Sequence, residues 1–252
     1  MENNFDYKRF KKVFIKDLKS LWPRFGLSLL IIMLLPTAIW ILETSGTDEI
    51  MPNARLAMID SAVILAAILA PSRLYKYCNT PNKGIHFAML PASKSEKFWS
   101  MVLMTAIVVP LIAFCGMMLL DITLTFFGGA YREWIFTAFG PLSMEERIWM
   151  IIVTLVTFNA IPATFFFTAT LFKKYKVART FLWALLLGFI LTILGINLLN
   201  FTFFDMMLNS TLKGISRVDS EVMFYCIYFP IVILWTVGFY YAAYYRLKRM
   251  KY

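Results

Sequence analysis

The chain has little of what hydrolytic and metal-dependent enzymes require. It contains one histidine among 252 residues, His86, which excludes a zinc site of the His-Glu-x-x-His kind. No Gly-x-x-x-x-Gly-Lys-Ser/Thr segment is present to hold nucleotide phosphates. The three cysteines, Cys78, Cys115 and Cys226, are far apart and match neither a disulfide framework nor a metal-binding spacing. We therefore expect no catalytic centre, no metal ion and no directly bound cofactor in this chain.

Charged residues are also scarce, at 16% of the chain, whereas hydrophobic residues make up 60%. Several apolar runs approach or exceed the roughly 20 residues that an α-helix needs to cross a bilayer. We therefore expect an all-α integral membrane protein with six transmembrane helices. The expected spans are Phe25–Leu42, Leu56–Leu74, Trp99–Phe127, Ile148–Phe172, Thr180–Leu199 and Met223–Tyr245.

The basic residues are distributed unevenly between the segments that join these spans. Twenty of the 25 lysine and arginine residues lie in the N-terminal segment, in the loops after the second and fourth spans, and in the C-terminal tail. Because cytoplasmic loops carry an excess of lysine and arginine, this distribution places both termini in the cytoplasm. The net charge of +10 is thus explained by membrane topology, and we expect no nucleic-acid partner.

The domain organisation follows from these spans. Residues 1–24 are expected to form a cytoplasmic amphipathic helix, residues 25–245 a transmembrane domain with a cytoplasmic loop at 75–98, and residues 246–252 a basic tail. Within Phe5–Trp22, apolar residues recur at helical spacing and lysines occupy the other positions, which favours a helix lying flat on an anionic membrane surface. An ordinary positive flank of the first span is the alternative, and Pro23 would mark the bend. The apolar positions are Phe10, Val13, Phe14, Leu18 and Leu21.

Three polar residues fall inside expected spans. Asp60 and Asp121 each lie about six residues, or roughly 9 Å, from the outer end of their spans. No lysine or arginine is expected at that depth, since Arg55 is assigned to the outer loop. The two acids are therefore expected to line an external vestibule or to hydrogen-bond between helices, with a proton relay as the alternative. Asn159, close to Pro162, would form either a kink or a polar contact between helices.

The second cytoplasmic loop ends in the segment 90–97, Leu-Pro-Ala-Ser-Lys-Ser-Glu-Lys. Ser93 and Glu96 have the spacing of a capping box, in which each side chain bonds the other residue's backbone N–H. Pro91 disfavours helical backbone at Leu90. The segment therefore predicts a helix that begins at Ser93 and continues into the third span.

This motif, in a basic loop between the second and third of six spans, resembles the membrane subunits of type-2 ATP-binding-cassette (ABC) exporters, in a form similar to that of Bacteroidota. The resemblance implies a multi-pass permease of the bacterial inner membrane, paired with itself or a sister permease. It also implies a separate ATPase subunit that binds the loop at 83–97, so ATP would act only through that partner. The implied coupling residues are Leu90, Pro91, Ser93, Lys94, Glu96 and Lys97.

The resemblance further implies that the N-terminal helix is the elbow helix of such permeases and that residues 200–222 include short re-entrant helices. Two other functions remain open from the sequence. The chain could be a non-enzymatic membrane protein that binds a partner, such as an immunity or assembly factor. It could also be a proton-coupled secondary transporter that uses Asp60 and Asp121.

Overall fold

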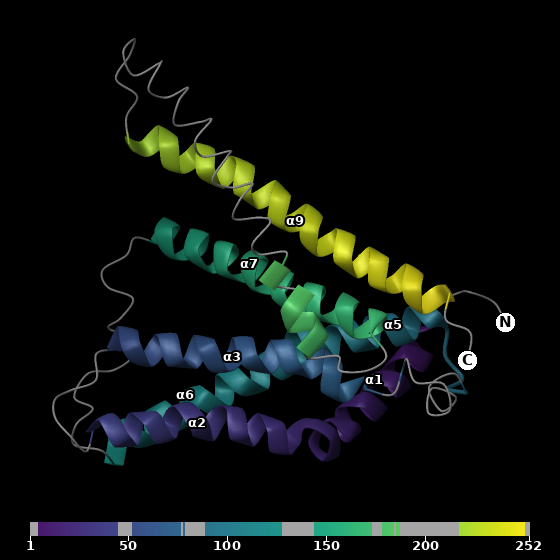
Figure 1. The fold of residues 1–252 in the computed structure, drawn as a ribbon, viewed down its shortest axis with the longest axis horizontal. Helices are drawn as coiled ribbons and strands as arrows, with labels where there is room; N and C mark the ends of the chain where they lie inside the picture. Colours follow the sequence, from purple (N-terminus) through teal and green to yellow (C-terminus); the bar gives the residue numbers. More distant parts are fainter. Residues whose placement is uncertain are drawn as a thin grey trace, which may run out of the picture.

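The protein is described by a computed structural model, whose described residues are helical except at 5–6, 75–76, 78, 89–93 and 172 (Figure 1). Those residues are 5–44, 52–76, 78, 89–127, 144–172, 178–183, 185–186 and 217–249. The fifth expected span, the loop at 200–216, Lys83 and His86 lie outside them, apart from the start of that span. The helices are α1 (Tyr7–Leu21), η1 (Trp22–Gly26), α2 (Leu27–Thr44), α3 (Pro52–Leu74), α5 (Lys94–Leu103), η2 (Met104–Val108), α6 (Val109–Phe127), α7 (Met144–Leu171) and α9 (Arg217–Arg249).

Four helical runs each contain an 18-residue stretch that is apolar enough to cross a membrane. These runs overlap the first four expected spans, so the prediction of a multi-pass membrane protein is supported. α9 contains the sixth expected span, whose membrane crossing stays a prediction. The runs are Tyr7–Trp40, Ala54–Leu74, Lys94–Phe126 and Thr154–Leu171.

Several helices begin earlier than the apolar runs alone predict. α3 begins at Pro52, because the fixed φ of proline suits the first helical position and its missing N–H has no partner there anyway. α7 begins at Met144, so Glu145 and Glu146 occupy its first turn, where acidic residues are favourable. α9 begins at Arg217, so residues 217–222 belong to a helix and not to the loop predicted to extend to 222.

Two short π-helical segments interrupt the longest runs. η1 contains Pro23 and joins α1 to α2, and in Figure 1 α1 leaves the direction of α2 at this point. This agrees with the expected bend. η2 ends two residues before Pro110, whose ring clashes with the carbonyl four residues earlier and which donates no hydrogen bond. The helix from Lys94 to Phe127 is therefore one run with a wide turn inside it.

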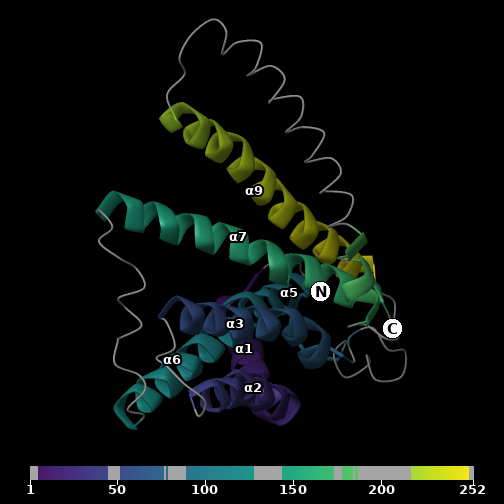
Figure 2. The same cartoon turned by 60° about the vertical axis from the view of Figure 1, so that its left-hand side comes forward.

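α3 occupies the centre of the bundle, with α7 and α9 on one side and α2 and α6 on the other (Figures 1 and 2). On α3, the fully buried Ala62, Ala66 and Ala70 recur every four residues. Small side chains let neighbouring helices approach closely, which is the usual means of helix association in membranes. α6 packs on α3 and supplies the equally buried Ala113 and Met117.

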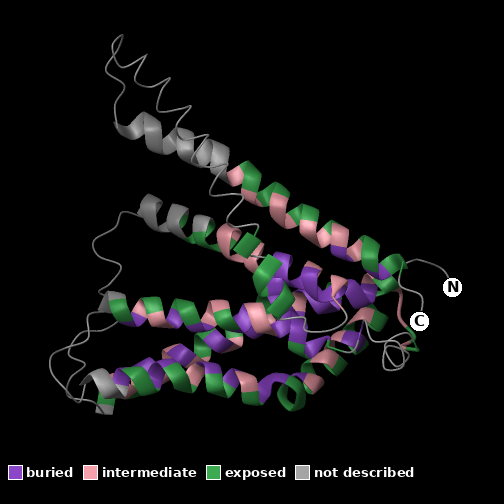
Figure 3. Cartoon of the chain, viewed as in Figure 1, coloured by how far each residue is buried: buried purple, intermediate pink, exposed green. Residues whose placement is uncertain are grey.

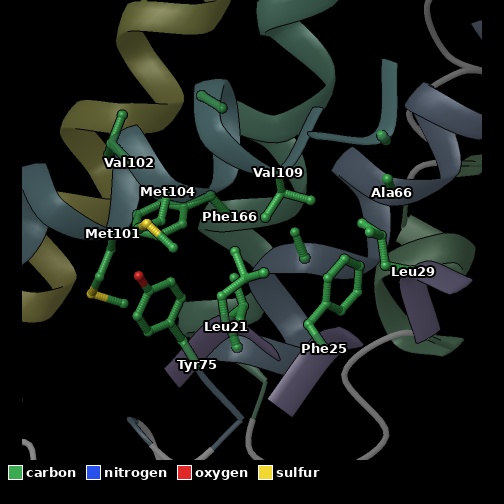
Figure 4. Close-up of a cluster of buried hydrophobic side chains, with 14 of the residues drawn as sticks. Leu21, Phe25, Leu29, Ala66, Tyr75, Met101, Val102, Met104, Val109 and Phe166 are labelled. Atoms are coloured by element: carbon green, nitrogen blue, oxygen red, sulfur yellow. The ribbon is translucent and has the colours of Figure 1, made fainter. Parts of the chain in front are cut away.

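α7 and α9 form the second contact region and approach each other toward the end that holds Arg249 (Figure 1). The indole N–H of Trp235 donates to the Thr164 hydroxyl at 3.0 Å. The Phe167 and Phe239 rings lie 5.3 Å apart. Buried residues concentrate where α7 and α9 meet α5 and η2, as Figure 3 and the close-up in Figure 4 show.

Candidate functional site

The candidate site lies at the end of the bundle where three basic segments meet. The start of α1, the start of α5 and the end of α9 are neighbours there (Figure 1). The sequence assigns each of these segments to the cytoplasmic side. The site is built around the loop that precedes α5.

The capping box predicted at the start of α5 is confirmed. The backbone N–H of Glu96 donates to the Ser93 hydroxyl at 3.2 Å, and the backbone N–H of Ser93 donates to Oε2 of Glu96 at 2.9 Å. Both donors belong to the first turn of a helix, where N–H groups have no partner within the helix. The loop therefore passes into α5 with a defined geometry.

The other oxygen of the Glu96 carboxylate binds a different helix. Oε1 accepts the backbone N–H of Asp6 at 2.9 Å, and the Arg9 guanidinium lies 3.4 Å away. Asp6 is the N-cap residue of α1, and its own carboxylate accepts the backbone N–H of Lys8. The Glu96 side chain is 0% exposed. One buried carboxylate thus binds the first turns of two helices that lie 90 residues apart in the chain.

A carboxylate on α1, that of Asp17, also contacts α5. Asp17 accepts hydrogen bonds from the Ser100 hydroxyl at 2.7 Å and from the Tyr75 hydroxyl at 3.3 Å. Burial raises the pKa of the Asp17 carboxyl, and these two hydrogen bonds and the charges of Lys16 and Arg24 offset part of the increase. Burial and the neighbouring Asp17 together raise the pKa of Tyr75 well above its ordinary value. Asp17 therefore joins α1 to α5 and to the end of α3.

The opposite side of α5 contacts α9. The Lys94 ammonium donates to the backbone carbonyl of Lys248 at 2.6 Å, which satisfies an acceptor in the last turn of that helix. The hydroxyls of Ser95 and Tyr244 lie 3.2 Å apart, and the Phe98 ring packs edge-on against Tyr244 at 5.2 Å. The first turns of α5 are thus held between α1 and α9.

The residues just before the capping box are open to solvent. Met89 is 75% exposed, Pro91 is exposed and Leu90 is half-buried. The Ala92 N–H donates to the Leu90 carbonyl at 2.7 Å, which closes a tight turn. We call Met89–Ala92 the loop tip. Its two exposed side chains, Met89 and Pro91, are apolar.

The residues predicted to couple this chain to an ATPase therefore differ in burial. Pro91 and Lys94 are exposed, Leu90 and Ser93 are half-buried, and Glu96 and Lys97 are buried. Side chains buried in the bundle cannot contact a partner in this conformation. Glu96 instead accepts hydrogen bonds inside the protein from Ser93 and Asp6. The sequence predicts only the first of these, through the capping box.

The intramembrane acids occupy two different environments. Asp121 is paired with Arg55: Nε donates to Oδ1 at 2.8 Å and Nη2 donates to Oδ2 at 2.7 Å. Nη2 also donates to the Thr125 hydroxyl at 2.9 Å. The Arg55 and Asp121 side chains are 1% and 2% exposed. Asp60 is exposed and has no hydrogen-bond or ion-pair partner in the part of the chain that the structure describes.

These contacts correct the expectation that no arginine or lysine stands near the two acids. Arg55 does not belong to the outer loop. Because α3 begins at Pro52, Arg55 lies in its first turn and turns inward toward α6. Of the two expectations for Asp121, the hydrogen bond between helices is therefore observed. Asp121 and Asp60 do not form one acidic site.

Asn159 does not provide the polar contact between helices among the described residues. Its side-chain amide donates to the Leu155 carbonyl of its own helix at 2.8 Å. The polar contact between α7 and α9 is made instead by Thr164 with Trp235, a pair that the sequence did not single out. Threonine and tryptophan in apolar spans carry no distinctive pattern, so no signal marked them.

Comparison of the chain with protein-family models, with curated proteins and with solved structures finds no match in any of the three. The functional assignment therefore depends on the geometry of the site and on the motif at 90–97.

Proposed function

We propose that this chain is the permease subunit of a type-2 ABC exporter in the bacterial inner membrane. It would act as a homodimer or as a heterodimer with a sister permease. The loop tip would bind a separate ATPase subunit, which would bind and hydrolyse the ATP. This chain would supply no catalytic residue and would convert movements of the ATPase into movements of its own helices.

The observation that carries this proposal is the double role of Glu96. Its carboxylate binds the first turns of α1 and α5 at once, so a force on the loop tip reaches both helices. α5 continues through η2 into α6 without a break. At 1.5 Å per residue, Asp121 lies roughly 38 Å along this run from Glu96. A displacement of the loop tip would therefore move the Arg55–Asp121 pair.

Rigidity is what such a connection requires, because a flexible loop would absorb the movement. The Ser93 capping box, the Asp17–Ser100 hydrogen bond and the Lys94–Lys248 contact hold the first turns of α5 from three sides. The exposed and apolar Met89 and Pro91 are left free to enter a groove on a partner. These features support a docking element that is fixed at its base and open at its tip.

Secondary transport by a pair of acids receives less support from this arrangement. Both carboxylate oxygens of Asp121 accept hydrogen bonds from Arg55, whose guanidinium also donates to Thr125, so this acid is held in a contact between helices. A protein that only binds a partner would share the exposed loop tip. It would differ in having no nucleotide-hydrolysing partner.

A pull-down in mild detergent with identification of the co-purifying chains tests the proposal. We expect a stoichiometric soluble ATPase that is lost in the double variant Met89→Asp/Pro91→Gly, because both side chains are exposed and neither supports the capping box. Arg246→Asp, which changes an exposed residue at the same end of the bundle, is the matched control and should retain the partner. Recovery of the chain alone, or with a partner that lacks nucleotide-binding motifs, would refute the proposal.

A further inference from the structure

α1 has two apolar surfaces, and only one of them is used by the fold. The sequence predicts that Phe10, Val13, Phe14, Leu18 and Leu21 face the membrane. The structure contradicts this for most of them, because Val13 and Leu21 are buried in the protein and Phe14 packs against the core. The reason is Asp17, which lies on the same face and is hydrogen-bonded to α5.

A second apolar stripe remains exposed along the whole length of α1. Tyr7, Ile15, Leu18 and Trp22 are 69%, 39%, 43% and 62% exposed, and at about 100° per residue they share one face of the helix. Lys11 lies within this stripe. Because α1 lies outside the expected spans, this exposed apolar stripe marks a surface that binds lipid or another protein.

The lysines beside the stripe indicate that it binds an anionic membrane surface. Lys8, Lys12 and Lys19 are all exposed and lie on the face of α1 adjacent to the stripe, on the side away from α5. A helix with aromatic and aliphatic residues on one face and lysines on the next is the pattern of a helix lying in the interface of an anionic membrane. Each lysine near such a surface contributes attraction to anionic headgroups.

The position of α1 supports the same interpretation. α1 continues through η1 into the apolar helix α2, so its last turn lies where the chain enters the membrane. Trp22, in η1, lies against the backbone of Gly26, where a Cβ atom would come within 2.9 Å of the indole ring. Tryptophan is enriched at the level of lipid headgroups. Gly26 thus makes room for the ring at this boundary.

We propose that α1 binds the anionic lipid surface through Tyr7, Lys11, Ile15, Leu18 and Trp22, and that Glu96 passes this attachment on to the loop tip. The second step follows from the hydrogen bonds that Glu96 accepts from Asp6 and Ser93. A membrane that holds α1 in place also holds the base of the loop. Anionic lipid therefore sets how firmly Met89–Ala92 is positioned. This inference does not depend on the identity of the partner at the tip.

Spin labels on single cysteines test the lipid surface in the full chain, after Cys78, Cys115 and Cys226 have been replaced. The protein is placed in nanodiscs of phosphatidylcholine with or without phosphatidylglycerol. With phosphatidylglycerol, labels at Ile15→Cys and Leu18→Cys should collide with oxygen, which enters lipid, and not with a water-soluble nickel chelate. A label at Lys12→Cys should show the reverse, and one at Val13→Cys should be protected from both.

The triple variant Lys8→Gln/Lys12→Gln/Lys19→Gln should abolish the effect of phosphatidylglycerol on the labels at Ile15 and Leu18. The triple variant Arg246→Gln/Lys248→Gln/Arg249→Gln removes the same charge from the same end of the bundle and should leave it unchanged. Equal access of the nickel chelate to Ile15 and Leu18 in both lipids would overturn the proposal. So would protection of both labels only when a soluble protein partner is added, which would make the stripe a protein contact.

The transmission to the loop tip is measured with a label at Met89→Cys. Its mobility should fall when phosphatidylglycerol is added to the otherwise unchanged chain, and this response should be lost in Glu96→Gln. A response that persists in Glu96→Gln would show that lipid reaches the tip by another route and would overturn the role of Glu96. Because no ATPase is present, failure here is separate from failure of the proposed function.

Discussion

The two ends of the long helix from Lys94 to Phe127 are both fixed by a buried carboxylate, but by different chemistry. At one end, Glu96 accepts two backbone N–H groups and one guanidinium at 3.4 Å. At the other end, Asp121 is bound by the side chain of Arg55 through two short hydrogen bonds. Backbone donors recognise an acceptor of suitable shape, whereas a buried arginine requires a negative charge.

This difference teaches what each end can tolerate. At the Glu96 end, loss of the carboxylate leaves two neutral backbone N–H groups whose hydrogen bonds are only partly buried. A buried arginine inside the bundle cannot lose its partner without remaining charged and desolvated. The Glu96 end should therefore tolerate loss of its carboxylate better than the Arg55–Asp121 end.

Removing the charge of Asp121 should have the largest effect. We expect Asp121→Asn to destabilise the protein by about 3–5 kcal/mol, since Arg55 stays buried without its counter-charge. The measurement is thermal unfolding of the purified protein in one detergent. Asp60→Asn, on the exposed face of α3, should change the midpoint little. The exchange Arg55→Asp/Asp121→Arg should recover part of the loss, and no recovery would show that shape and not charge determines this contact.

Glu96 should respond to substitution in a graded way. Glu96→Ala leaves two partly buried N–H groups without their acceptor, at a cost of about 1 kcal/mol each. Glu96→Gln keeps one oxygen, which can accept from Asp6 or from Ser93 but cannot reproduce both bonds. Amide hydrogen exchange at these two residues gives the measurement. We expect both amides to lose protection in the alanine variant and only one in the glutamine variant, and equal loss in both variants would contradict this account.

The sequence predicts the local part of this site and misses the part that joins distant segments. The Ser93–Glu96 capping box spans three residues, and such short spacings can be recognised directly. The bonds from Glu96 to Asp6 and from Arg55 to Asp121 join residues 90 and 66 positions apart. No periodicity or spacing in one sequence reports such a pairing.

The same distinction applies to the fold. Apolar length predicts the first four spans because lipid requires every backbone group of a crossing helix to be satisfied within it. The face of α1 that meets the protein could not be predicted from its amphipathic pattern. Two apolar stripes and one buried acid, Asp17, share that helix, and only the position of α5 decides which stripe is covered.

Ser93→Ala should affect the start of α5 and leave α1 in place. Loss of the capping hydroxyl should cost about 1 kcal/mol, because Glu96 can still accept from Asp6. Hydrogen exchange should show faster exchange at the Glu96 amide and unchanged protection at Asp6. Ser95→Ala, whose hydroxyl lies beside Tyr244 and caps no helix, is the matched control. Faster exchange at Asp6 in Ser93→Ala would mean that the two helix starts are held as one unit.

The smallest effect should be a dependence of stability on pH that originates at Asp17. Its pKa is raised in the folded protein above the ordinary value of 3.8, chiefly by burial. A group of this kind favours folding when it is protonated, so its contribution is complete below about pH 3.8 and is lost as the pH rises through the folded pKa. Asp17→Asn should remove this part of the pH dependence of the unfolding midpoint. Asp6→Asn, on the exposed N-cap of the same helix, is the suitable comparison. If Asp17→Asn left the slope between pH 4 and neutral pH unchanged, the hydrogen bonds from Ser100 and Tyr75 would balance the effect of burial, and the raised pKa of Asp17 would be refuted.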